Sequence, residues 1–91
     1  MSVAETIRDK LTRRFAPTRL AIVDDSRRHA GHVGARPEGE THFTVTIVAR
    51  AFAGQSRVAR QRLVHETLAA ELATDIHALS LIVLAPDEDK G

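Results

Sequence analysis

The sequence predicts a small α/β (α+β) domain of element order αββααβ, with a three-stranded mixed sheet covered by helices on one face. Three observations predict it: an apolar stripe at helical spacing near the N-terminus, two short β-prone segments on either side of a glycine-rich stretch, and a second helical stripe followed by an apolar segment. The 91 residues are expected to form one domain over 1–91, with a core at about residues 3–84 and an acidic tail at 85–91.

A first helix is expected over residues 2–15. Its apolar side chains recur every four positions, at Val3, Ile7, Leu11 and Phe15. This spacing places them on one face of a helix. Ser2 and Glu5 have the spacing of a capping box at its start. Pro17 ends the helix, because the residue before a proline avoids the helical region.

Two strands are expected next, at residues 18–24 and beginning at His42. In the second strand Phe43, Val45 and Ile47 alternate with polar residues, which is typical of a half-buried strand. Residues 26–40 between them are rich in glycine and lack apolar periodicity, so we expect a long loop joining an antiparallel pair.

A helical region follows the second strand. Ser56 is a candidate N-cap. The buried face is marked by Val64, Leu68 and Leu72, and the region ends near residue 73. A straight helix would direct Arg60 toward the core, so we expect a break near residues 60–62, giving a short helix and then a longer one.

The last strand is expected over residues 76–84. Leu79, Leu81 and Val83 share one face, and Ile82 and Leu84 the other. A strand that is apolar on both faces is expected well inside the sheet. Residues 86–91 are expected to be a frayed acidic tail.

The composition excludes several classes of function. There are five histidines and no cysteine, so the chain has no thiol chemistry and imidazole is its only good ligand for a borderline-soft metal. No apolar run is long enough for a membrane span and no secretory signal pattern is present, so we expect a cytoplasmic protein. Without a cysteine nucleophile or a nucleophile-elbow motif, we do not expect an enzyme.

The net charge of +1 hides an asymmetry along the chain. Residues 50–62 carry four arginines and no acid, whereas residues 63–91 carry six acids and one lysine. Arg57, Arg60 and Arg62 are candidate phosphate contacts for nucleic acid. A solvated or partner-docking face is the alternative.

Several motifs together resemble the BolA family, over about residues 3 to 84. The matching strings are Asp24-Asp25-Ser26, His29-Ala30-Gly31-His32, Thr41-His42-Phe43, Phe52-Ala53-Gly54, Ser56-Arg57-Val58, Arg60-Gln61-Arg62-Leu63-Val64 and Ile76-His77-Ala78-Leu79-Ser80-Leu81. The resemblance implies a fold similar to a class II KH domain, with the αββααβ order expected above.

The resemblance also implies a function in iron–sulfur cluster trafficking or iron regulation. BolA-like proteins are partners of monothiol glutaredoxins, with which they share a two-iron, two-sulfur cluster that also uses glutathione. The resemblance implies His77 as one ligand and a histidine between the first two strands as the other. His32 is preferred and His29 is the alternative. We expect structural or surface roles for His42 and His65, and a monomer or weak homodimer in isolation.

Some members of the family are DNA-binding transcriptional regulators of cell morphology and stress responses, which is the alternative implied function. It would use the KH-like helix-turn-helix surface and the arginines near residue 60. Two departures bear on it. The chain has Arg60-Gln61-Arg62 where BolA proteins often have Arg-His-Arg. It has Gly54-Gln55-Ser56-Arg57 in place of the Gly-X-X-Gly loop with which KH domains grip nucleic acid.

Overall fold

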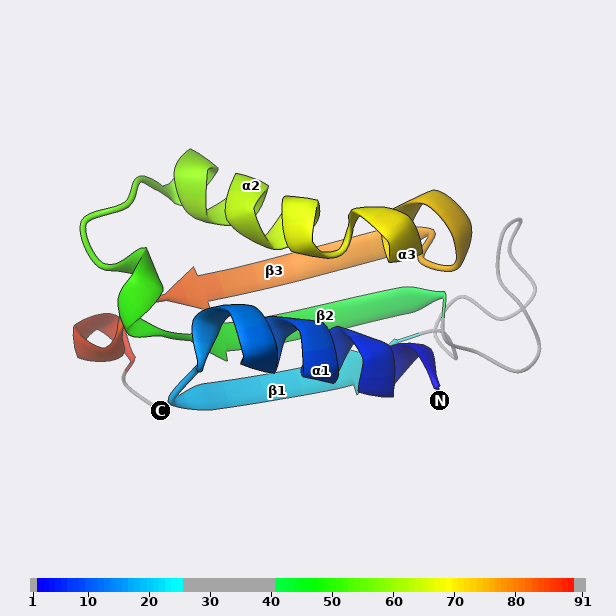
Figure 1. Ribbon diagram of the computed structural model, residues 1–91, viewed down its shortest axis with the longest axis horizontal. Helices are drawn as coiled ribbons and strands as arrows, with labels where there is room; N and C mark the ends of the chain where they lie inside the picture. Colours follow the sequence, from blue (N-terminus) through cyan, green and yellow to red (C-terminus); the bar gives the residue numbers. More distant parts are fainter. Residues whose placement is uncertain (1, 26–40, 90–91) are drawn as a thin grey trace.

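The computed structural model describes residues 2–25 and 41–89. The elements are α1 (Val3–Phe15), β1 (Arg19–Asp24), β2 (His42–Val48), η2 (Arg50–Phe52), α2 (Arg57–Thr67), α3 (Ala69–Thr74), β3 (Ala78–Leu84) and η3 (Pro86–Glu88). The strands form one sheet in the order β1-β2-β3, in which β1 is antiparallel and β3 parallel to β2. The expected αββααβ order and mixed sheet are confirmed (Figure 1). No helix within the described ranges is both long and apolar enough to cross a membrane.

Local signals in the sequence set both ends of α1. The Ser2 hydroxyl accepts from the Glu5 amide, and the Glu5 carboxylate accepts from the Ser2 amide, both at 3.1 Å, which completes the expected capping box. The helix ends at Ala16, which has a φ of 45°, directly before Pro17. The apolar stripe faces the core, and its last member, Phe15, packs with its ring centroid 4.9 Å from that of Phe52.

The core lies between the sheet and the helices. Phe43, Val45 and Ile47 of β2 are almost completely buried against α1 and the α2–α3 region. In Figure 1, α1 lies across β1 and β2 while α2 runs along β3. The polar residues that alternate with this row, Thr44 and Thr46, are only half-buried on the opposite face of the sheet.

The expectation that the last strand lies well inside the sheet is wrong. In the described part of the chain, β2 is the central strand, and β3 is an edge strand with β2 as its one neighbour. Leu79 and Leu81 pack against the core, whereas Ile82 points to the opposite face and is 49% exposed. The second apolar row of β3 thus faces away from the helices, which a pattern of hydrophobicity alone does not distinguish from burial on both faces.

The helical region does break, but at Leu68 and not near residues 60–62. Leu68 has φ −104° and ψ 17°, and the longer helix precedes the shorter one. Beside the break, the Thr67 hydroxyl donates to the Leu63 carbonyl at 2.8 Å, an interaction that often bends helices. Arg60 stays in a regular helix because its guanidinium donates to the Val83 carbonyl at 3.1 Å.

The acidic tail is held in place through Asp89, contrary to the expected fraying. η3 closes with a bond of 2.7 Å from the Ala85 amide to the Glu88 carboxylate. Glu88 also binds Arg60, and Asp89 accepts two hydrogen bonds from Arg19, at 2.7 and 3.0 Å. Residues 90 and 91 lie outside the described residues.

Candidate functional site

His77 occupies the junction between α3 and β3. The residue before it, Ile76, is 4% exposed and belongs to the core, whereas the His77 side chain is exposed. The His77 amide donates to the Thr41 carbonyl at 2.7 Å. Strand β3 begins one residue later, at Ala78. The backbone of His77 is therefore fixed on both sides while its imidazole faces solvent.

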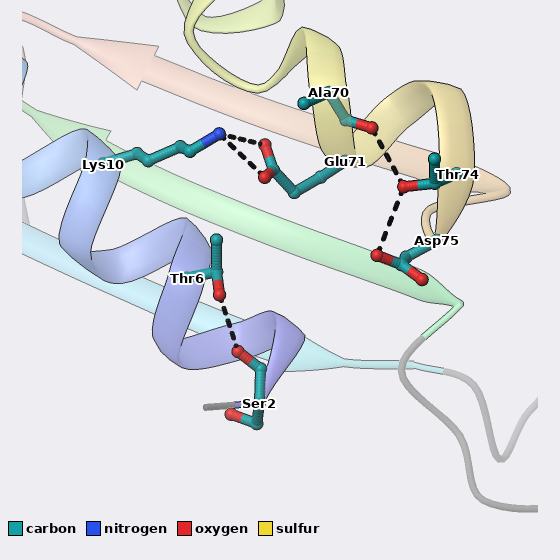
Figure 2. A network of polar contacts seen from close by, with 7 residues as sticks. All are labelled: Ser2, Thr6, Lys10, Ala70, Glu71, Thr74 and Asp75. Atoms are coloured by element: carbon teal, nitrogen blue, oxygen red, sulfur yellow. Dashed lines mark hydrogen bonds and ion pairs between the residues drawn. The ribbon is translucent and has the colours of Figure 1, made fainter.

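The turn that leads into His77 is anchored to the end of α3. The Glu71 carbonyl accepts from the amides of both Asp75 and Ile76, at 2.8 and 2.9 Å. The Glu71 carboxylate accepts from the Lys10 ammonium at 2.7 and 2.9 Å, which ties α3 to α1 (Figure 2). In the same view, the Thr74 hydroxyl bridges the Ala70 carbonyl and the Asp75 carboxylate. Together these contacts hold the turn between α3 and β3 and so fix the position of the His77 backbone.

The structure brings His42 close to His77. His42 is the first residue of β2 and is in parallel register with Ala78, so the two strands begin at the same end of the sheet. The two imidazole centroids are 6.3 Å apart. His42 is half-buried, and its Nδ1 lies 2.8 Å from the Thr41 hydroxyl.

The proximity of His42 was missed from the sequence because it depends on which strands pair. Alternation correctly places His42 opposite the core-facing Phe43. Only the parallel β2–β3 register shows that its neighbour across the sheet is the residue after His77. A histidine lies at or near the start of both expected strands, at His42 and at His77, and this shared position was the available signal.

The two loop candidates, His29 and His32, lie outside the described residues. The residues that flank this segment are described. The Asp25 amide donates to the His42 carbonyl at 2.7 Å, and the Asp25 carboxylate accepts from the Thr44 hydroxyl. At the other end, Thr41 accepts from the His77 amide. Asp25 and Thr41, the described residues on either side of positions 26–40, therefore both lie at the His42–His77 end of the sheet.

The described residues alone do not form a complete metal site. Within residues 2–25 and 41–89, no group of three or more histidine, cysteine, aspartate or glutamate side chains could hold a metal ion. An exposed imidazole can still contribute one ligand to a site completed by other groups. His65, the remaining histidine, is exposed on α2, as expected from the sequence.

The three candidate arginines differ in what they contact. Arg57 and Arg62 are exposed on α2, whereas the Arg60 side chain is 12% exposed and lies 2.5 Å from the Glu88 carboxylate. The hydrogen bond between Arg60 and Glu88 raises the pKa of Arg60 and lowers the pKa of Glu88. Arg60 is therefore engaged within the fold, whereas Arg57 and Arg62 form no ion pair within residues 2–25 and 41–89.

Comparison with known proteins agrees with this architecture. The family model for BolA-like proteins matches residues 11–88. The DNA-binding transcriptional regulator BolA of Escherichia coli is 41% identical over 91 residues, covering 100% of this chain and 83% of the relative. The chloroplast protein BOLA1 of Arabidopsis thaliana is 45% identical over 87 residues, covering 93% of this chain and 54% of the relative.

A solved structure extends the agreement to three dimensions. The BolA domain of SufE1 from Arabidopsis thaliana superposes with a TM-score of 0.87 at 42% identity, covering 98% of both chains. Sequence, family model and fold therefore lead to the same assignment: this chain belongs to the BolA family.

Proposed function

We propose that this protein is an adaptor that binds a monothiol glutaredoxin and shares a two-iron, two-sulfur cluster with it. His77 is one ligand, and a histidine of segment 26–40 is the second, with His32 preferred over His29. The glutaredoxin and glutathione supply the sulfur ligands, because this chain has no cysteine. The role is cluster trafficking or iron regulation.

The observation that carries the proposal is the hydrogen bond from the His77 amide to the Thr41 carbonyl. It holds an exposed imidazole next to the residue at which the histidine-bearing segment re-enters the sheet. Asp25, which precedes that segment in the sequence, is bonded to His42, so the two described residues that flank the segment, Asp25 and Thr41, both lie at the His77 end of the sheet. A rigid first ligand beside a segment rich in further ligands suits a site completed by a partner.

Histidine ligation has a chemical consequence for such a cluster. A neutral imidazole in place of a thiolate reduces the negative charge around the iron and raises the reduction potential, as in Rieske centres. His77 would contribute this effect through one ring nitrogen, with its backbone already held by Thr41.

The test is anaerobic cluster reconstitution of this protein with a monothiol glutaredoxin and glutathione, followed by visible circular dichroism. We expect a spectrum distinct from that of the glutaredoxin homodimer, which reverts to the homodimer spectrum in His77→Ala. His65→Ala is the matched control, because His65 is also exposed but lies on α2. An unchanged spectrum and cluster lifetime in His77→Ala would reject the ligand assignment.

The same assay separates the two loop histidines. His32→Ala and His29→Ala are compared in otherwise identical complexes. We expect His32→Ala to alter the spectrum and His29→Ala to preserve it, and the reverse result would transfer the role to His29.

A second candidate function is DNA binding. It is supported by the exposed Arg57 and Arg62 on one helix and by the DNA-binding relative from Escherichia coli. Contacts of arginine with phosphate release counterions, so affinity should fall steeply as salt concentration rises and should weaken in Arg57→Ala and Arg62→Ala. Absent or salt-independent binding of duplex DNA would remove this candidate.

A further inference from the structure

A groove runs between the first turns of α2 and the outer edge of β3. It encloses about 410 Å³ and is lined by Arg57 and Gln61 on the helix side and by residues 81–84 on the strand side. In Figure 1 the start of α2 lies alongside the C-terminal end of β3. The groove is therefore at the other end of β3 from His77.

The backbone of β3 directs unused hydrogen-bonding groups into this groove. Alternate residues of β3 bond to β2, as shown by the Ala78 amide bonding to Thr41 and the Leu84 carbonyl bonding to Ala49. In a parallel pair the intervening residues point the other way, so Leu81 and Val83 direct their amides and carbonyls outward. An edge with free backbone groups is a template for one more strand.

One of these outward groups is already used, and the rest remain. Arg60 donates to the Val83 carbonyl, and its charge is paired with Glu88. Within residues 2–25 and 41–89, the Leu81 amide and carbonyl and the Val83 amide have no hydrogen-bond partner and are available to an incoming strand. Arg60 thus blocks the β3 edge at the Val83 carbonyl, near the C-terminal end of the strand. An incoming strand can therefore pair only with a short segment of β3.

The charge of the groove indicates what kind of segment would bind there. Glu88 is neutralised by Arg60, whereas Arg57 forms no ion pair within residues 2–25 and 41–89. The unbalanced charge is therefore positive. A second copy of this chain would bring a second Arg57 to the same edge, which like-charge repulsion disfavours.

We propose that this groove binds an extended peptide segment of a partner protein that adds as a strand to the edge of β3 and places an acidic side chain against Arg57. Strand addition supplies affinity through backbone hydrogen bonds, and the Arg57 contact supplies the preference for acidic sequences. This docking site goes beyond the proposed cluster-sharing function, because it uses neither His77 nor the histidine segment.

The first test measures amide hydrogen exchange by NMR with and without a synthetic hexapeptide of alternating valine and threonine that carries one central aspartate. We expect the peptide to slow exchange at Leu81 and Val83 and to leave Ile82 unchanged, because the Ile82 amide already faces β2. Unchanged exchange at Leu81 and Val83 up to millimolar peptide would overturn the proposal. Protection of these amides that grows with protein concentration without peptide would overturn it in favour of a dimer.

The second test exchanges the charge at the helix. Arg57→Glu should weaken binding of the aspartate peptide about fivefold. It should strengthen, by a similar factor, binding of the same hexapeptide with lysine in place of the aspartate. Arg62→Glu is the matched control, because Arg62 is exposed on the same helix but does not line the groove. Loss of binding in Arg62→Glu, with Arg57→Glu unaffected, would place the peptide elsewhere and contradict the proposal.

Discussion

Arg60 connects three parts of the chain through one guanidinium. Its Nη1 lies 3.1 Å from the Val83 carbonyl and 2.5 Å from the Glu88 carboxylate. The first contact joins α2 to β3, and the second joins α2 to η3. The part of the acidic tail that forms η3 therefore belongs to the folded domain.

Glu88→Gln should destabilise the protein at neutral pH and much less in acid. The hydrogen bond from Arg60 lowers the pKa of Glu88 in the folded state. The stabilisation of the fold by ionised Glu88 is therefore fully present above the pKa of Glu88 in the unfolded chain, and it is lost as pH falls through the lower pKa in the folded protein. Urea denaturation of both proteins at neutral pH and well below pH ~4.5 measures this. Asp87→Asn is the control, and a wild-type advantage that persists unchanged in acid would contradict the assignment.

Ser2→Ala should reduce the free energy of unfolding by about 1 kcal/mol. The mutation removes the hydroxyl that accepts from the Glu5 amide at the start of α1. Chemical denaturation provides the measurement. Thr12→Ala, at an exposed position later in the helix, should be neutral or slightly stabilising. Equal losses in both variants would show that capping is not the cause.

Leu68→Ala should cost about 2–5 kcal/mol, because Leu68 is fully buried at the break between α2 and α3. Val58→Ala is the contrasting variant, since Val58 is 58% exposed, and its effect should stay within about 0.5 kcal/mol. Thermal and urea unfolding test both. A small loss for Leu68→Ala would mean that the α2–α3 junction repacks around the cavity.

His77→Ala should change the free energy of unfolding by less than about 0.5 kcal/mol, because the side chain is exposed and the hydrogen bond to Thr41 uses the backbone. Denaturation of the isolated protein checks this. The result matters for the cluster assay, in which a large loss of stability would make a changed spectrum uninformative about ligation.

The sequence predicted the parts of the fold that depend on local chemistry. Ser2 caps α1 and Ser56 caps α2, and both interactions follow from side chains within three residues of their partners. The alternation around Phe43 also correctly identified the buried face of β2.

The features that were predicted wrongly depend on contacts between distant residues. The position of β3 at the edge depends on which strand pairs with which, and the regular helix around Arg60 depends on Val83 and Glu88, more than twenty residues away. The order of the tail likewise depends on Arg19 meeting Asp89. For the candidate site, His77 was proposed from the family resemblance, whereas the proximity of His42 to it depends on the strand register.

The parallel strand β3 has a further consequence because it is straight and of fixed length. His77 precedes its first residue, and Val83 is six residues later. At about 3.3 Å per residue these positions are separated by roughly 20 Å. A single partner that engaged both ends would need an arm of that reach, whereas two smaller partners could bind at once without touching. The length of the strand thus determines whether one partner can contact both sites or whether two partners bind them separately.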